Sequence, residues 1–236
     1  SGASVNCIFT NSPLVANVTI NKQMQDINGQ NAQPRQGWTV GAAATATPGS
    51  VASTSPSSAT QTTDANGDAV WNVTFASSSS TATVAVHEEQ QTGYDFVTGS
   101  CTVTKLGGST TKTRLDGPGA QNLTGVGPGD QVNCIYTNKP SSATLTLVKK
   151  VNIQYGGTAQ ATAWTLAATG QTPISGPTGS AAVTNAVVSP GTYTLSESGG
   201  PACYQQTGAW TCTGATATGN SVTVARNDKV TCTVTN

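Results

Sequence analysis

Short runs in which apolar and polar residues alternate make up most of the chain. In residues 144–147, for example, Leu145 and Leu147 alternate with Thr144 and Thr146. Successive residues of a β-strand point to opposite faces, so this alternation predicts half-buried strands. The 3.6-residue period of an amphipathic helix is absent. Turn-forming stretches such as DANGD (64–68) and SPG (189–191) separate the runs. The expected fold class is therefore all-β.

The same landmarks occur twice, in the same order. Residues 131–138 (QVNCIYTN) and 229–236 (KVTCTVTN) nearly coincide, and residues 4–11 (SVNCIFTN) resemble both. The other matching pairs are VTINKQM (18–24) with LTLVKKV (145–151), WTVGAAA (38–44) with WTLAATG (164–170), VAVHEEQ (84–90) with YTLSESG (193–199), and SCTV (100–103) with TCTG (211–214). A repeat of this kind predicts two copies of one structural unit.

Each copy is expected to be an antiparallel β-sandwich of immunoglobulin-like architecture with roughly six to nine strands. The two sandwiches would follow each other in tandem, over residues 12–140 and 141–236, and the linker NKPSS (138–142) supports this boundary. Residues 1–11 would be the last strand of an upstream repeat. Alternatively, they would be a strand that is donated to a neighbouring subunit.

The two-residue period places charged and amide side chains on the apolar faces of three strands in each copy. Lys149 is in phase with Leu145 and Leu147, and Lys22 is in phase with Val18 and Ile20. The same phase relation holds for Glu88, Glu197, Asn138 and Asn236 with the apolar residues that precede them. Burying an unpaired ammonium group is costly, so each lysine must find a partner, lose its proton or lose its charge by chemistry.

Lysine, glutamic acid and asparagine together suit one reaction. Burial favours the neutral amine of a lysine, which is a nucleophile, and the protonated form of a glutamic acid. The acid can polarise the asparagine side-chain carbonyl and pass a proton to the departing ammonia. The product is an amide between lysine Nζ and asparagine Cγ. A buried lysine–glutamate ion pair without a covalent bond is the alternative.

The pattern K…E…N, with lysine on the first strand, glutamate after a YTLSE-like strand and asparagine at the end of the last strand, resembles the Cna B-type (prealbumin-like, SpaA-like) repeat domains. These domains occur in surface adhesins and pilins of Gram-positive bacteria. The resemblance implies an isopeptide bond Lys22–Asn138 promoted by Glu88, and a second bond Lys149–Asn236 promoted by Glu197. The first copy departs in part from the family pattern, because HEEQ replaces the more typical LSES.

Composition narrows the function further. Charged residues make up 8% of the chain, against roughly 25% in typical soluble domains. The net charge is zero and the basic residues are scattered, which argues against nucleic acid as a partner and against binding to a membrane surface. No apolar run approaches the roughly 18 residues of a membrane span, and no signal peptide is visible.

The six cysteines form no CxxC pair and His87 is the only histidine, so neither a metal site nor a cofactor is predicted. An even cysteine number with low charge favours an extracellular, cell-surface location. The repeat aligns Cys101 with Cys212 and Cys134 with Cys232, which predicts the disulfides Cys101–Cys134 and Cys212–Cys232. The remaining two, Cys7 and Cys203, could pair with each other, link neighbouring chains or stay free.

The favoured function is a structural stalk or repeat module of an extracellular adhesin or pilus-like filament, stabilised by isopeptide bonds and disulfides. Its partners would be neighbouring repeats or subunits, and a host or surface ligand remains conceivable. The alternative is a secreted ligand-binding sandwich that uses exposed aromatic residues, for which the candidates are Trp38, Trp71, Trp164 and Trp210. A turnover enzyme is not expected, because no Ser/His/Asp order and no Gly-rich phosphate loop is present.

Overall fold

The computed structural model describes residues 14–47, 52–154 and 156–236. Contacts divide the chain into two compact units, the first built mainly from residues up to Lys139 and the second mainly from Pro140 onward. Strands dominate both units, and the all-β expectation is confirmed. The predicted strand 1–11, which contains Cys7, lies outside the described residues.

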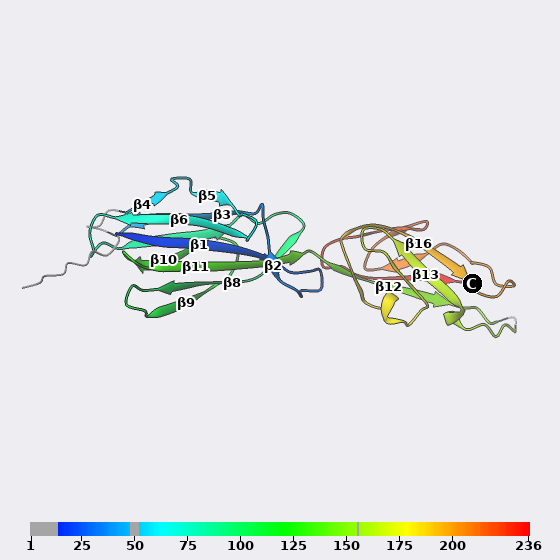
Figure 1. Ribbon diagram of the computed structural model, residues 1–236. Coiled ribbons are helices and arrows are strands. Elements are labelled where there is room, and N and C mark those ends of the chain that lie inside the picture. Colours follow the sequence, from blue (N-terminus) through cyan, green and yellow to red (C-terminus); the bar gives the residue numbers. More distant parts are fainter. Residues whose placement is uncertain (1–13, 48–51, 155) are drawn as a thin grey trace, which may run out of the picture. The chain divides into compact units, whose positions relative to one another are not determined.

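The first unit is a sandwich of two sheets (Figure 1). The larger sheet has the order β4-β6-β1-β11-β8-β9, with β2 added to β1, and the smaller sheet has the order β10-β7-β3-β5. The strands are β1 (Val15–Met24), β2 (Gln33–Pro34), β3 (Thr39–Ala46), β4 (Ala52–Ser55), β5 (Thr60–Thr62), β6 (Asp68–Phe75), β7 (Ala82–Glu88), β8 (Tyr94–Thr104), β9 (Thr110–Leu115), β10 (Gln121–Val126) and β11 (Gln131–Pro140).

The second unit repeats this plan with shorter strands. One sheet has the order β15-β12-β20-β17, and the other has the order β14-β13-β16-β19-β18. Its elements are β12 (Ala143–Lys150), η1 (Ala161–Ala163), β13 (Trp164–Thr169), β14 (Ile174–Gly176), η2 (Ala181–Val183), β15 (Ala186–Val188), β16 (Gly191–Gly199), β17 (Thr211–Thr213), β18 (Ala217–Thr218), β19 (Ser221–Val224) and β20 (Lys229–Thr235).

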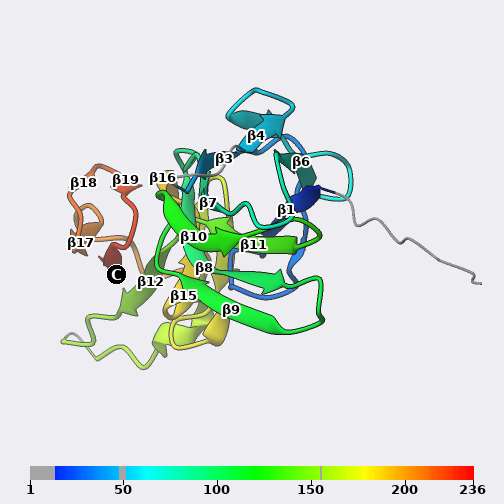
Figure 2. The ribbon, with the colours of Figure 1, turned by 90° about the vertical axis from the view of Figure 1, so that its left-hand side faces the viewer.

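The first and last strands of each unit are neighbours that run in the same direction. β1 lies between β6 and β11 (Figures 1 and 2), and its pairing with β11 is parallel, as is the pairing of β12 with β20. These two pairs depart from the antiparallel pairing that the sequence predicted for the sandwiches. Parallel neighbours need a long connection. Here the whole remainder of the unit, which passes through the second sheet, is that connection.

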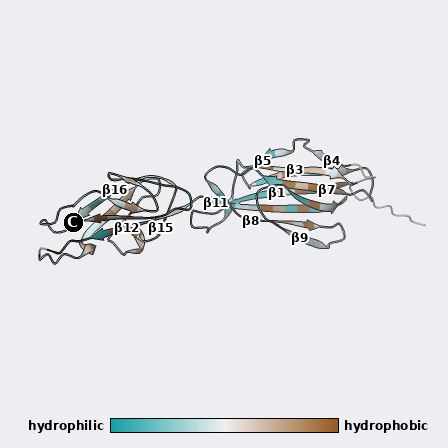
Figure 3. Ribbon diagram, turned by 180° about the vertical axis from the view of Figure 1, so that it is seen from behind, coloured by the Kyte–Doolittle hydropathy of each residue, from teal (hydrophilic) through white to brown (hydrophobic). Residues whose placement is uncertain are grey.

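Both cores follow the alternation of the sequence. Figure 3 shows hydrophobic and hydrophilic residues alternating along strands such as β1 and β11, and the burial of β1 alternates residue by residue. All four tryptophans, Trp38, Trp71, Trp164 and Trp210, are buried. They are therefore core residues, and the exposed aromatic surface required by the ligand-binding alternative is not formed by them.

Candidate lysine–glutamate–asparagine sites

Lys22 and Asn138 lie on neighbouring parallel strands and point into the core of the first unit. In the β1–β11 ladder, Lys22 is paired with Tyr136 and Met24 is paired with Asn138. Residues two apart on a strand share a face, so Lys22, Tyr136 and Asn138 project from the same side of the sheet. All three are fully buried. The register therefore places the lysine beside the asparagine, displaced by two residues along the strands.

Glu88 reaches this lysine from the opposite sheet. It is the last residue of β7, and its Oε2 lies 2.5 Å from Lys22 Nζ, with both side chains fully buried. The ammonium group also lies 4.4 Å from the centre of the Trp38 ring, which comes directly before β3. A cation over an aromatic face is favourable. The lysine is thus held between a carboxylate and an indole.

Burial shifts the protonation equilibria at this site. Burial lowers the pKa of Lys22 from 10.5 to about 8, although the hydrogen bond to Glu88 and the charge of that carboxylate act in the opposite direction. Burial raises the pKa of Tyr136 well above its ordinary value, and the negative charge of Glu88 raises it further. A neutral amine is therefore more accessible at Lys22 than at an exposed lysine, while the phenol keeps its proton.

Two buried oxygen atoms of the first site lack a hydrogen-bond donor. Glu88 Oε1 and Asn138 Oδ1 have no partner, and the Asn138 amide nitrogen makes only one long contact, 3.5 Å to Gln90 Oε1. Both unpaired atoms are acceptors while the carboxyl group is ionised. The first site therefore holds two buried acceptor atoms that no donor among the described residues satisfies.

The second unit repeats the arrangement at matching positions. Lys149 on β12 contacts Glu197 on β16 through Nζ and Oε2, and its Nζ lies 4.9 Å from the centre of the Trp164 ring. Lys149 is paired with Val234 on β20, so Asn236 lies two residues further along on the same face. Asn236 Oδ1 is also buried without a hydrogen-bond partner.

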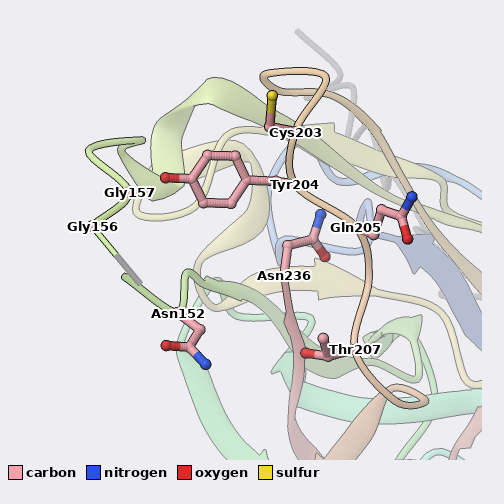
Figure 4. Close-up of a pocket in the computed structure, with 8 residues that line it drawn as sticks. All are labelled: Asn152, Gly156, Gly157, Cys203, Tyr204, Gln205, Thr207 and Asn236. Atoms are coloured by element: carbon pink, nitrogen blue, oxygen red, sulfur yellow. The ribbon is translucent and has the colours of Figure 1, made fainter. Parts of the chain in front are cut away.

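The two sites differ in how far water can reach them. The side chain of Glu88 is fully buried, whereas that of Glu197 is 12% exposed. Asn138 is fully buried, whereas Asn236 borders a cavity of about 420 Å³ (Figure 4), into which its amide points between Tyr204 and Gln205. The first site is therefore closed to bulk solvent, whereas the second borders it.

Four of the six cysteines form two disulfides. Cys101–Cys134 joins β8 to β11, and Cys212–Cys232 joins β17 to β20. Each disulfide therefore ties the last strand of its unit to an internal neighbour on the side away from the first strand. Cys203 is exposed and forms no disulfide with any described cysteine.

Sequence reasoning missed the contact of the matching tryptophans, Trp38 and Trp164, with the lysines. In each unit the tryptophan also meets the edge of a tyrosine ring, with Trp38–Tyr94 and Trp164–Tyr204 centroids 5.2 Å and 5.5 Å apart. The available signal was the coincidence of the repeated WT dipeptide with the repeated lysine. The position of Tyr136 beside Lys22 has no counterpart in the second unit, where Val234 is the residue paired with Lys149.

Within residues 14–47, 52–154 and 156–236, no group of three or more His, Cys, Asp and Glu side chains is arranged to hold a metal ion. The carboxylate of Asp64 accepts hydrogen bonds from the backbone N–H groups of Asn66 and Asp68, which closes the turn before β6. A search of the same residues for a helix long and apolar enough to cross a bilayer is negative.

Residues 140–234, nearly all of the second unit, match the family model of a prealbumin-like fold domain. No curated protein matches the chain. Among solved structures, a major pilin of Streptococcus pyogenes is 14% identical, with a TM-score of 0.43 over 96% of this chain and 99% of the pilin. A C-terminal fragment of the pilus adhesin SpaC of Lactobacillus rhamnosus GG is 15% identical, with a TM-score of 0.41 over 92% of this chain and 96% of the fragment.

Proposed function

We propose that this chain is a structural module of an extracellular stalk or pilus-like filament on a bacterial surface, and that each unit cross-links itself through a lysine–asparagine isopeptide bond. The bonds would be Lys22–Asn138 and Lys149–Asn236. The duplicated contact of a buried lysine with a glutamate, beside an asparagine whose carbonyl oxygen is unpaired, carries this proposal. The family match of residues 140–234 to a prealbumin-like domain supports it.

The reaction needs no cofactor and balances within each site. A proton moves from the lysine ammonium group to the glutamate, which leaves a neutral amine and a neutral acid. Nζ attacks Cγ of the asparagine, the new C–N bond forms, and the bond from Cγ to Nδ2 breaks. The glutamic acid gives its proton to the departing nitrogen, the attacking nitrogen passes one of its protons to the glutamate, and ammonia leaves. Each unit reacts once, so the chain has no turnover activity.

A bond at this position would join the strands at which a unit begins and ends. The first unit begins with β1 and ends with β11, the second begins with β12 and ends with β20, and the connection between the units runs from β11 to β12. Tension along a tandem array would therefore run from one strand to its covalently linked neighbour, and the rest of the sandwich would not be extended. The disulfide on the last strand adds a second constraint. Neighbouring repeats or subunits of the same assembly are the expected partners.

The test is the intact mass of the purified chain under denaturing and fully reducing conditions. Each isopeptide bond releases one ammonia and lowers the mass by about 17 Da, a change that reduction does not reverse. A loss of about 34 Da is expected. In Lys149→Ala only one ammonia should be lost, so the mass should lie about 17 Da below the value calculated for that sequence. Lys150→Ala alters the adjacent exposed lysine and is the matched control, which should still lose about 34 Da. An unchanged mass in the wild-type chain would leave two buried ion pairs and refute the cross-linking.

A further inference from the structure

Lys22 lies one residue beyond the end of the pairing between β1 and β6. The last pair in that ladder is Asn21 with Asp68. The peptide groups of Lys22 are nevertheless bound, because its N–H donates to the Gly67 carbonyl at 2.7 Å and its carbonyl accepts from the N–H of Arg35 at 2.8 Å. The main chain of this lysine is therefore held by two segments outside β6.

The turn before β6 is built to present the Gly67 carbonyl. Asp64 closes it, since its carboxylate accepts hydrogen bonds from the N–H groups of Asn66 and Asp68 at 2.8 and 2.9 Å. The N–H of Gly67 donates to the Asp64 carbonyl at 3.0 Å. Gly67 has a φ of 78°, a conformation that favours glycine. The direction of its carbonyl is thereby fixed from within the turn.

The same turn packs directly on β1. The Asn21 side-chain amide donates to the Asn66 carbonyl at 3.0 Å and to Asp68 Oδ1 at 2.6 Å. A Cβ at Gly67 would lie 2.5 Å from the Lys22 carbonyl oxygen, so glycine is needed for this close approach. The position of the Lys22 main chain is therefore coupled to the turn 64–68.

The second unit holds its lysine with a side-chain hydroxyl group. Pairing of β12 with β15 ends at Leu145, well before Lys149. The N–H of Lys149 donates to Thr178 Oγ1 at 3.2 Å. Thr178 is half-buried and lies between β14 and η2. In both units, then, the lysine lies past the end of a strand that pairs with the first strand, and a separate loop supplies the acceptor for its N–H.

The main chain of each lysine affects where the nitrogen of its side chain lies. The peptide groups fix the direction of the Cα–Cβ bond, and the long side chain carries any rotation of that bond to Nζ. In the first unit, Glu88 and Trp38 contact the Nζ end. Displacing a reacting atom by about 1 Å can lower a rate about 100-fold. An acceptor at the lysine N–H constrains the other end of the nucleophile.

We propose that the turn 64–68 and Thr178 position the nucleophilic lysines, Lys22 through the Gly67 carbonyl and Lys149 through the threonine hydroxyl group. Asp64 and Thr178 are positioning residues, because they act through the main chain of the lysine. The inference rests on the proposed cross-linking. It gives the sequence DANGD, which lies outside the K…E…N pattern, a part in the first reaction.

The experiment follows the two reactions separately within one molecule. The full chain is synthesised in a cell-free reaction, samples are quenched in denaturant at intervals, and protease-released peptides report the cross-linked fraction of each unit by mass spectrometry. Thr178→Val keeps the shape of the side chain and removes the acceptor. It should slow the second reaction about fivefold, the effect of one lost hydrogen bond between uncharged groups. The first reaction is the internal clock and should keep its rate.

Two controls separate the hydrogen bond from packing. Thr178→Ser retains the hydroxyl group and should react at the wild-type rate, whereas Thr194→Val makes the same exchange at an exposed position of β16 and should change neither rate. Denaturant unfolding in an Asn236→Ala background, in which the second unit does not react, measures the folded fraction of each variant. Rates are divided by this fraction, so a hydrogen bond that serves stability alone predicts a wild-type corrected rate.

The turn of the first unit is tested at Asp64, which is exposed. Asp64→Ala removes the acceptor for two N–H groups of the turn and should slow the first reaction about fivefold, with the second reaction as the clock. Asp64→Asn keeps a side-chain oxygen at this position and should react at the wild-type rate. The folded fraction is measured in the same way in an Asn138→Ala background.

The outcomes separate the two proposals. Wild-type corrected rates in Thr178→Val and Asp64→Ala would overturn the positioning role and leave the cross-linking intact, and such a rate in one of them would overturn it for that unit. A slow reaction in Thr178→Ser or Asp64→Asn would assign the effect to packing and likewise contradict the proposal. Absence of ammonia loss from the wild-type chain would overturn both.

Discussion

Lys22 and Glu88 reach each other from opposite sheets of the first unit, with Nζ 2.5 Å from Oε2 and both side chains fully buried. A buried ion pair is weak evidence for stability, because the cost of removing two charges from water is comparable to their attraction. A chain with only 8% charged residues nevertheless places such a pair in the core of the first unit and a partly buried pair at the matching position of the second. The free-energy cost of burying these charges is explained if the pair is the starting point of a reaction.

Glu88→Gln is expected to block the first cross-link while the second still forms. Glutamine has nearly the shape of glutamate but cannot take a proton from Lys22 and return it to the departing ammonia. The first unit should therefore keep its ammonia, and peptides that contain Lys22 and Asn138 should be about 17 Da heavier than in the cross-linked chain. Its free energy of unfolding should fall by about 3 to 5 kcal/mol, because an ammonium group is left buried without its counter-charge.

Glu89→Gln is the matched control for this change. Glu89 is the next residue in the chain, carries the same charge and is exposed, so its replacement should leave both the mass and the stability of the first unit unchanged. Full cross-linking in Glu88→Gln would exclude an acid function for Glu88.

The stability of an uncrosslinked first unit should rise with pH. In Asn138→Ala the amine of Lys22 has no electrophile and stays free. Its pKa is about 8 in the folded unit and returns to 10.5 on unfolding. Between these values the unfolded chain binds more protons, so the free energy of unfolding increases with pH. From about pH 8 to about pH 9.5, below the titration of ordinary tyrosines, the increase should be roughly 1.5 kcal/mol.

Denaturant unfolding at several pH values measures this slope. The double variant Asn138→Ala, Lys22→Met lacks the titrating amine and should show a flatter dependence. The cross-linked wild-type chain should resemble the double variant, since an amide nitrogen does not titrate in this range. An equal slope in all three proteins would show that Lys22 is not the group responsible.

Alternation of side chains was sufficient to predict the all-β class and the burial of the lysine and asparagine of each unit and of Glu88, whereas Glu197 is only partly buried. Parallel pairing of β1 with β11 could not be predicted, because alternation tells which face a side chain occupies and not the direction of the neighbouring strand. The contact between Lys22 and Trp38 joins strands of different sheets and has no periodic signal. The first unit has eleven described strands, more than expected, since the short β2, β4 and β5 have no alternation to detect.

Gly200→Ala should destabilise the second unit more than Gly208→Ala. Both glycines have a positive φ near 80°, so alanine at either position costs about 1 to 2 kcal/mol of backbone strain. A Cβ at Gly200 would also lie 2.2 Å from Cε2 of Trp164, whereas a Cβ at Gly208 would meet nothing within 4 Å. The clash should add about 1 to 3 kcal/mol and displace the indole from Lys149. Denaturant unfolding measures the loss of stability, and the near-ultraviolet circular dichroism of tryptophan reports the displacement of the indole. Equal losses of stability in the two variants would contradict the close packing of Gly200 on Trp164.

Removal of the disulfide in the second unit should lower its stability without affecting its isopeptide bond. Cys212 and Cys232 are separated by 20 residues, and a loop of that length predicts a loss of about 3 kcal/mol in the double variant Cys212→Ala, Cys232→Ala. The disulfide ties β20 to β17, whereas Lys149 and Asn236 are on β12 and at the end of β20. The two constraints therefore act on opposite sides of the last strand.

Calorimetry should show a lower melting temperature for the second unit alone, and the mass should still lack about 34 Da. Cys203→Ala, which removes an exposed cysteine, should change neither value. Retention of ammonia in the second unit of the double variant would show that the disulfide has to form before β20 can present Asn236 to Lys149.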